Sequence, residues 1–290
     1  MAVVTVLWLY EKPRADRDVL PAYIPPVPSA EEVVVAAVGD FGTGGDAQRA
    51  VGEQMCRARD VLGFDRVLTT GDNVYDSGDP GDFALKFFEP FACLLGDGVE
   101  FRAVLGNHDV QTAGGAPEIS EPRFGMLGRY YTWSQGPMRF VMLDSTAIDP
   151  AQAKWTRTTL ERLSDAPWTI VVLHHPVYSG GAGHGSTPGL APRLAPMFEA
   201  NGVDLVLQGH DHVYSRGRTG GVTYVVTGGG GAGLHGCADP MPRPVNVCAS
   251  EHHFVALGAS RSRLVLTAVT SEGGMIERVR VRRNFSIAPG

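Results

Sequence analysis

Short apolar runs rich in β-branched residues alternate with segments of helical periodicity in the first part of the chain. Two segments, Asp46–Asp60 and Asp149–Leu163, are predicted as helices, and each opens with an aspartate that suits an N-cap. Because strands that alternate with helices usually form a sheet covered by those helices, the pattern predicts an α/β architecture. The apolar runs predicted as strands are Val33–Val38, Arg66–Thr70, Phe101–Leu105, Phe140–Leu143, Thr169–Leu173 and Val203–Leu207.

Beyond Gly221 the helical periodicity disappears, and further apolar runs follow one another with only turns between them. These runs are expected to form a second, largely antiparallel sheet that closes the same domain. Residues 1–30 are expected to be a leader or linker, because the stretch 13–28 is rich in proline. Residues 31–290 are expected to form a single domain. The predicted C-terminal strands are Val222–Thr227, His253–Leu257, Arg263–Thr270 and Met275–Val281.

The composition adds a constraint on the partners of this 290-residue chain. A formal net charge of −6 argues against non-specific binding to nucleic acid, which needs a basic surface. The apolar run from Ala2 to Tyr10 is too short to span a bilayer and follows no basic residue, so neither a membrane partner nor an intact signal peptide is expected. A trimmed signal peptide stays open, and a secreted or periplasmic location is slightly favoured over the cytoplasm. The oligomeric state is not specified by the sequence.

The four cysteines fall into two groups. Cys237 and Cys248 flank a proline-rich loop, which a disulfide between them would staple in an oxidising compartment; two unpaired thiols are an equally good interpretation. Cys56 and Cys93 lie in helical segments and are expected to be ordinary core residues.

Candidate chemistry lies where the predicted strands end. The carboxyl ends of parallel strands meet in one crevice, so polar clusters that follow several strands are expected to converge. A single Gly-Asp pair more often serves as a turn or a helix cap, but five clusters of metal-ligand residue types in order predict a multinuclear metal site. The clusters are Gly39-Asp40, Gly71-Asp72-Asn73-Val74-Tyr75, Gly106-Asn107-His108-Asp109, His174-His175-Pro176 and Gly209-His210-Asp211-His212.

The order of these clusters resembles the motifs of the calcineurin-like metallophosphoesterases, which read GD, GD, GNH(D/E), a strand-end His and GHxH. The resemblance runs from Asp40 to His212. It implies a four-layer αββα sandwich, in which helices flank two central mixed β-sheets, and it makes residues 31–290 one catalytic domain. Tyr75 behind Asp72, and His184 after the strand-end His174, most resemble the compact, tartrate-resistant type of purple acid phosphatase.

The resemblance implies a dinuclear metal centre. Asp72 would bridge the two ions, because the two oxygens of one carboxylate can bind separate metals at short spacing. Tyr75 would offer a phenolate, a hard anionic donor suited to Fe(III), and the second position would take Fe, Zn or Mn. The implied ligands are Asp40, Asp72, Tyr75 and His212 for the first metal, and Asp72, Asn107, His174 and His210 for the second.

Other polar residues near the clusters receive smaller roles. The resemblance implies that His108 and His184 contact the phosphate or assist proton transfer. Asp109 and Asp211 are expected to orient histidine rings. His175 is assigned no role, Arg216 and Arg218 are expected to be solvated loop charges, and His235, His252 and His253 are expected to be structural.

The implied reaction is that of an acid phosphatase. A metal-bound hydroxide would attack the phosphorus of a small phosphate monoester while His108 and His184 assist departure of the alcohol. Two other functions stay open: a phosphodiesterase of the same fold that acts on cyclic nucleotides or other diesters, and a non-catalytic module that binds metal or phosphate.

Overall fold

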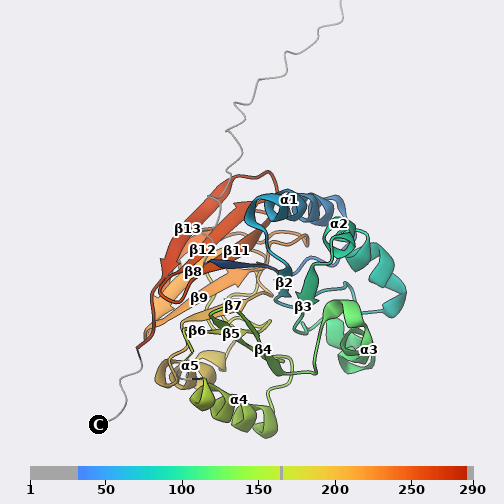
Figure 1. The fold of residues 1–290 in the computed structure, drawn as a ribbon. Coiled ribbons are helices and arrows are strands. Elements are labelled where there is room, and N and C mark those ends of the chain that lie inside the picture. Colours follow the sequence, from blue (N-terminus) through green and yellow to red (C-terminus); the bar gives the residue numbers. More distant parts are fainter. Residues whose placement is uncertain (1–31, 164–165, 286–290) are drawn as a thin grey trace, which may run out of the picture.

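The computed structural model describes residues 32–163 and 166–285, and the predicted leader at residues 1–30 lies outside the described residues. Two β-sheets lie face to face between layers of helices (Figure 1). The six-stranded sheet contains, in spatial order, β13 (Met275–Val281), β12 (Leu264–Thr270), β11 (His253–Ala259), β1 (Val33–Val38), β2 (Arg66–Thr69) and β3 (Glu100–Arg102). The seven-stranded sheet contains β10 (Val245–Ala249), β8 (Tyr214–Thr219), β9 (Val222–Thr227), β7 (Leu205–Gln208), β6 (Trp168–Val172), β5 (Met138–Met142) and β4 (Tyr131–Gln135).

Both sheets are mixed, as the resemblance to the metallophosphoesterases implied. Strands β1, β2 and β3 are parallel, and β11 to β13 continue that sheet in antiparallel pairs. In the other sheet β5, β6, β7 and β9 are parallel. Strand β4 pairs antiparallel with β5 at one edge, and at the other β8 pairs antiparallel with β9 and β10 pairs antiparallel with β8.

The prediction of a separate C-terminal antiparallel sheet is wrong. Strands β11 to β13 join β1 through the pairing of β11 with β1, whereas β9 lies in the other sheet between β8 and β7. The apolar pattern of each run predicts a strand but carries no information about its partner, because pairing depends on contacts between residues far apart in the sequence.

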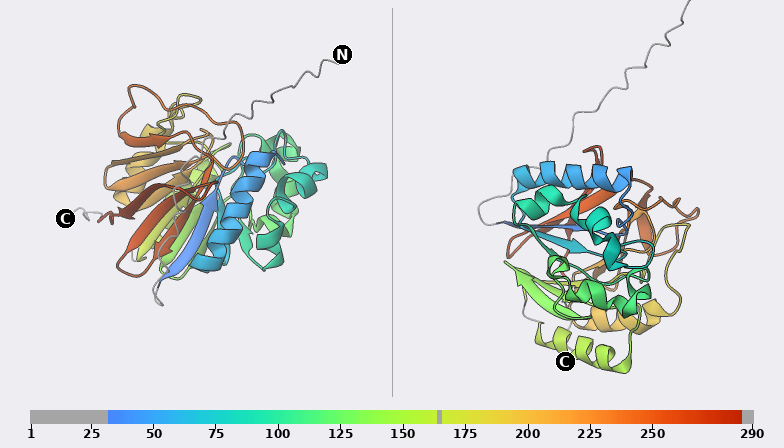
Figure 2. Two further views of the ribbon diagram at one scale, coloured as in Figure 1. Left: turned by 90° about the horizontal axis from the view of Figure 1, so that it is seen from above. Right: turned by 90° about the vertical axis from the view of Figure 1, so that its right-hand side faces the viewer.

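The helices α1 (Asp46–Leu62), α4 (Pro150–Arg162) and α5 (Leu190–Ala200) form the outer layers. Helix α1 lies over the six-stranded sheet, and α4 and α5 lie on the opposite side of the molecule against the seven-stranded sheet (Figure 2). Strand β6 shows why both faces of a sheet are covered. Ile170 and Val172 belong to the core between the sheets, whereas Val171 packs with the residues of α4 and α5.

The two predicted helices differ in how they begin. Asp149 is the N-cap of α4, and its side chain accepts a hydrogen bond of 2.7 Å from the backbone N–H of Gln152. Asp46, in contrast, lies in the first turn of α1, and the N-cap is Gly45, which has no side chain to make a cap bond. Asp46 is therefore not the cap that the sequence suggested.

All four cysteines are paired in disulfides. Cys237–Cys248 is the stapled alternative of the two predicted for that pair. The prediction for Cys56 and Cys93 is wrong, because helix α2 (Ala92–Gly96) lies against α1 and brings their Cα atoms within 6.3 Å. A helical pattern places each cysteine on its own helix but does not show which helices touch.

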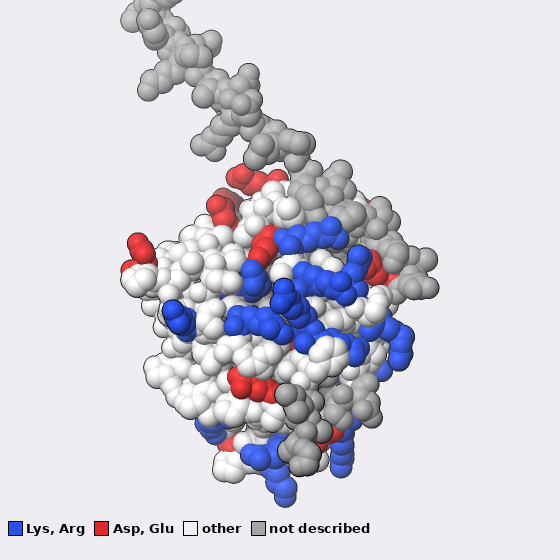
Figure 3. Space-filling model, turned by 90° about the vertical axis from the view of Figure 1, so that its left-hand side faces the viewer, with Lys and Arg blue, Asp and Glu red and all other residues white. Residues whose placement is uncertain are grey.

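The charge of the molecule is unevenly distributed. Lysine and arginine side chains gather on the face that carries β12 and β13 (Figure 3). Arg278 and Arg280 of the edge strand β13 are exposed. Charged side chains on an edge strand hinder pairing with another chain. This face is thus basic although the formal net charge of the chain is −6.

In the described residues no helix is long and apolar enough to cross a membrane.

Replacing Asp149 by Ala is expected to lower the free energy of unfolding by about 0.5–2 kcal/mol, because it removes an N-cap acceptor. Asp46→Ala is the matched control, since Asp46 makes no cap bond, and it should change stability less. Urea denaturation of both variants measures the difference, and equal losses would contradict the assignment of the cap.

Candidate metal centre

The predicted ligands converge at the carboxyl ends of parallel strands. Asp40 and Asp72 follow β1 and β2, and His174 and His210 follow β6 and β7. Three of these residues have a left-handed backbone: φ is 56° at Asp40, 51° at Asp72 and 69° at His210. Residues other than glycine rarely adopt this conformation, and such strain is concentrated at functional sites. The left-handed conformation turns the backbone sharply after each strand and directs the side chain toward the other predicted ligands.

Neighbouring glycines make room for the carboxylates. A Cβ atom on Gly209 would lie 2.5 Å from Asp40 Oδ2, and a Cβ atom on Gly106 would overlap Asp72 Oδ1. The glycines of these motifs are thus needed because the carboxylate of one strand end packs directly against the backbone of another.

The donor atoms form two groups. In the first, His212 Nε2 lies 3.2 Å from the Tyr75 hydroxyl and 3.6 Å from Asp40 Oδ1. In the second, His174 Nε2 lies 3.0 Å from Asn107 Oδ1 and 3.2 Å from His210 Nδ1.

Asp72 lies between the two groups. Its Oδ2 is 3.6 Å from His174 Nε2, and donor atoms of Asp40, Asp72 and His174 all lie within 4.8 Å of one another. The structure therefore brings together all seven residues that the sequence singled out as ligands, in the two sets expected; that they bind metal remains a prediction.

Backbone carbonyls fix which nitrogen of two rings faces the centre. His174 Nδ1 lies 2.9 Å from Thr70 O, and His212 Nδ1 lies 2.7 Å from Gly233 O. A carbonyl oxygen only accepts, so each Nδ1 carries the proton and each Nε2 presents a lone pair to the site. These histidines are oriented as metal ligands are.

The site combines buried carboxylates with neutral histidine rings, and this combination suits a bound cation. Burial raises the pKa of Asp40, and the nearby Asp72 raises it further. Burial also lowers the pKa of His174 and His212, and it lowers that of His210 to about 3, so these rings are neutral near pH 7. Among the described residues only histidines lie within ion-pair distance of Asp40 and Asp72. Carboxylates and neutral imidazoles that converge in this way fit bound metal ions.

Tyr75 can serve the first donor group only if its phenol loses the hydroxyl proton. Burial, followed by the nearby carboxylates Asp40 and Asp72, raises the pKa of its phenol. The hydroxyl therefore keeps its proton unless a strongly acidic cation takes the place of that proton. A trivalent ion polarises a phenol more strongly than a divalent one and meets that requirement best.

The two predicted catalytic histidines border the site. The ring of His108 lies against Tyr75, with centroids 4.6 Å apart, and its Nδ1 donates a 2.6 Å hydrogen bond to the carbonyl of Asp76. The Nε2 atom is thus the nitrogen that remains for a substrate. His184 is exposed and stacks on His210 with a centroid separation of 4.1 Å. Their chemical roles stay predictions.

Asp109 does not orient a histidine ring, contrary to expectation. Its carboxylate accepts hydrogen bonds from the backbone N–H groups of Asn73, Val74 and Gly106, so it ties the loop after β2 to the loop after β3. The buried Glu118 accepts from the Asn73 side chain beside it and was not found from the sequence. A glutamate in a short, otherwise ordinary helical segment gives no local sign of such a contact.

One further prediction about the surroundings of the site is corrected, and the place of one histidine becomes visible. Arg216 is not a solvated loop charge, because it lies in β8 and forms a two-pronged ion pair with Glu277 of β13. His235, which was expected to be structural, lies beside the site, because its ring stacks on His212. Both contacts join residues far apart in sequence. The sequence feature that could have pointed to His235 is its place in a glycine-rich stretch after the GHDH motif.

Comparison with known proteins gives the family context. A family model described as calcineurin-like phosphoesterase matches residues 23–214. The chain is 27% identical over 274 residues to purple acid phosphatase 7 of Arabidopsis thaliana, covering 83% of each chain. It is 28% identical to the human tartrate-resistant acid phosphatase type 5, covering 67% of this chain and 71% of that one.

Solved structures share the fold. A purple acid phosphatase from yellow lupin seeds matches with a TM-score of 0.75 at 20% identity, over 90% of this chain and 55% of that one. GAP50, described as the anchor in the inner membrane complex of Plasmodium, matches with a TM-score of 0.78 at 18% identity, over 88% of this chain and 90% of that one. Purple acid phosphatases and the wider phosphoesterase family use a dinuclear metal centre.

Replacing Gly106 by Ala is expected to weaken metal binding by about 10–100-fold, the range seen when the support of a metal ligand is lost, because the new Cβ displaces Asp72. Gly96→Ala is the control, since no atom lies within 4 Å of the Cβ it would add. Competition titration with a chelator measures both affinities. Unchanged binding by the Gly106 variant would show that Asp72 does not need its present position.

Proposed function

The chain belongs to the calcineurin-like phosphoesterase family, and we propose that it hydrolyses small phosphate monoesters at a dinuclear metal centre bridged by Asp72. The observation that carries this proposal is the division of the donor atoms into two groups on either side of one buried carboxylate. The names of the matched relatives, which are acid phosphatases, support a monoester as the substrate.

We infer that Asp40, Asp72, Tyr75 and His212 hold the first metal. Asn107, His174 and His210, together with Asp72, hold the second. When bound, such a centre supplies positive charge for the phosphate oxygens and activates water. Fe(III) is proposed beside Tyr75 and Fe, Zn or Mn at the second position.

The protein's own groups contribute orientation and proton transfer. The backbone N–H of His108 donates a 2.9 Å hydrogen bond to Asp72 Oδ1, which fixes the loop carrying His108 relative to the proposed bridge. The His108 ring is held by Asp76 and Tyr75, and in its doubly protonated form it would donate the Nε2 proton to the departing alcohol oxygen. His184, exposed beside His210, is proposed to contact the phosphate from the other side.

Hydrolysis rates on p-nitrophenyl phosphate and bis-p-nitrophenyl phosphate test the proposal, with protein reconstituted with Fe, Zn or Mn. We expect a clear preference for the monoester. A preference for the diester would replace the proposal with a phosphodiesterase. No turnover of either substrate by metal-loaded protein would indicate a non-catalytic module.

Replacing His108 by Ala should leave metal content unchanged and lower kcat by about 10²–10⁴-fold, the effect of losing acid–base assistance. The reason is that His108 borders the centre but belongs to neither donor group. Metal analysis and steady-state kinetics on the same preparation separate the two effects. Loss of metal together with activity would make His108 a ligand.

Replacing Tyr75 by Phe should remove a visible absorption band from the iron-loaded protein, because the ring stays and only the donor oxygen is lost. The phenolate–Fe(III) charge-transfer band should colour the oxidised wild type pink to purple. Activity with a divalent pair should fall less than colour. Colourless iron-loaded wild type, or an unchanged band in the variant, would remove Tyr75 from the ligands.

A further inference from the structure

A histidine outside every predicted motif packs on the first donor group. His235 belongs to the loop between β9 and β10, and its ring lies parallel to that of His212, with centroids 4.3 Å and planes 10° apart. His235 Nδ1 donates a 2.8 Å hydrogen bond to Asp211 Oδ1. The backbone N–H of His212 lies 3.1 Å from the same nitrogen, which cannot accept it while it donates to Asp211. The ring is thus fixed in place and in orientation.

The same short segment holds His212 at two further points. Gly233 accepts the Nδ1 proton of His212 through its carbonyl, and the backbone N–H of His235 donates a 3.0 Å bond to the carbonyl of His212. His212 is the one histidine in the first donor group. His212 lies in the connection between β7 and β8, and residues 233–235 hold both its ring and its backbone carbonyl.

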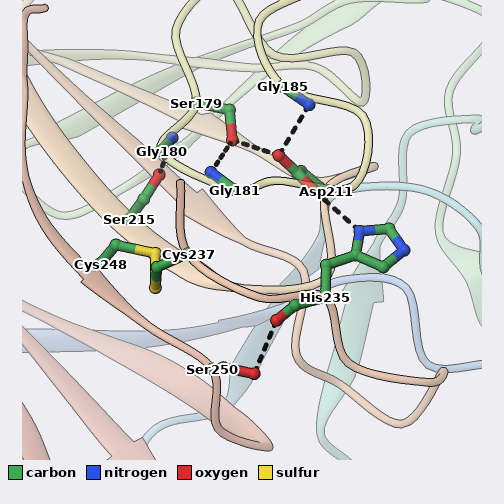
Figure 4. The surroundings of a disulfide bond; sticks show 10 residues. All are labelled: Ser179, Gly180, Gly181, Gly185, Asp211, Ser215, His235, Cys237, Cys248 and Ser250. Carbon is green, nitrogen blue, oxygen red and sulfur yellow. Dashed lines mark hydrogen bonds and ion pairs between the residues drawn. A yellow bond between two sulfur atoms is a disulfide. The ribbon is translucent and has the colours of Figure 1, made fainter. Parts of the chain in front are cut away.

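Asp211 connects this segment to the loop that carries His184. Its carboxylate accepts hydrogen bonds from the Ser179 hydroxyl, the backbone N–H of Gly185 and the His235 ring (Figure 4). It also accepts one from the backbone N–H of His184. A single carboxylate thus joins the two glycine-rich loops that border the proposed metal centre. An Asp–His pair in this position constrains both loops at once.

The disulfide anchors the far end of the segment. Cys237 bonds Cys248 of β10, and Cys248 pairs with Ser215 of β8, three residues beyond His212. Backbone hydrogen bonds from Ala182 to the Gly236 carbonyl and from Ala238 to the Gly180 carbonyl fasten the same stretch to the His184 loop, each at 2.8 Å. Cys237 is exposed, so solvent reductants can reach the bond.

We propose that His235 is a positioning residue for His212 and that the Cys237–Cys248 disulfide holds it there, so that occupancy of the Tyr75-side metal position depends on this disulfide. The inference rests on the metal centre of the proposed function. The inference goes beyond the proposed function because it assigns a role to a residue and to a disulfide that touch no substrate. Among the described residues no hydrogen bond or ring contact joins His235 to Asn107, His174 or His210. The one indirect link is the His184 ring, which lies 5.0 Å from the His235 ring and stacks on His210. The second position should therefore keep its affinity when His235 is lost.

The test is a chelator-competition titration that follows both metal equivalents of His235→Ala. We expect the affinity of one equivalent to fall about 10–100-fold, the usual effect of losing a residue that orients a metal ligand, while the other is unchanged. With iron, the visible band should weaken in parallel. His252→Ala is the control, because His252 also contacts this loop, at 3.3 Å from the Gly229 carbonyl, but touches no proposed ligand.

Paired cysteine variants test the disulfide. Cys237→Ser with Cys248→Ser should lose affinity at the same single position, whereas Cys56→Ser with Cys93→Ser should not, although that pair also has one exposed and one half-buried cysteine. Melting curves of the metal-free variants check that each one folds. If His235→Ala fails to fold, the cysteine pairs still decide the question.

The outcomes separate this inference from the proposed function. If His235→Ala and the Cys237/Cys248 variant bind both equivalents as wild type does, the positioning role is overturned while wild-type turnover stands. If both equivalents weaken equally, the segment supports the fold and not His212. If wild type binds two ions but hydrolyses nothing, the proposed function fails and the selective loss at one position still supports the role of His235.

Discussion

The side chains of Asp40 and Asp72 are almost completely removed from water and lie close to each other, and such an arrangement is costly for a folded chain unless positive charge compensates it. No lysine or arginine of the described residues lies within ion-pair distance of either carboxylate. The left-handed backbone at both residues and the bare glycines that face them serve the same arrangement. Under the proposed function, bound cations supply the positive charge on which both the stability and the chemistry of the site depend.

This constraint explains which parts of the surroundings are rigid. His174 and His212 are held by backbone carbonyls, and Asp109 ties together two of the loops that supply donors. Each of these contacts orders a polar group before any ion binds, so less entropy is lost on binding. His184, in contrast, lies exposed on a glycine-rich loop, where a residue that meets substrates of varied shape is expected.

The sequence predicted the strand ends and the donor residues because both signals are local. Val33–Val38 is recognisable from its own apolar pattern, and Asp40 follows it directly. The sequence did not predict which distant segments contact one another. The joining of β11 to β1, the ion pair of Arg216 with Glu277 and the stacking of His235 on His212 all depend on where distant segments meet, and no local pattern encodes that. The Cys56–Cys93 bond, across 37 residues, was missed for the same reason.

Metal analysis of protein purified without added metal, combined with anomalous diffraction from its crystals, tests the central claim most directly. The account predicts two metal ions per chain on either side of the Asp72 carboxylate, with iron on the side of Tyr75. A single ion, or two ions that do not share Asp72, would contradict it.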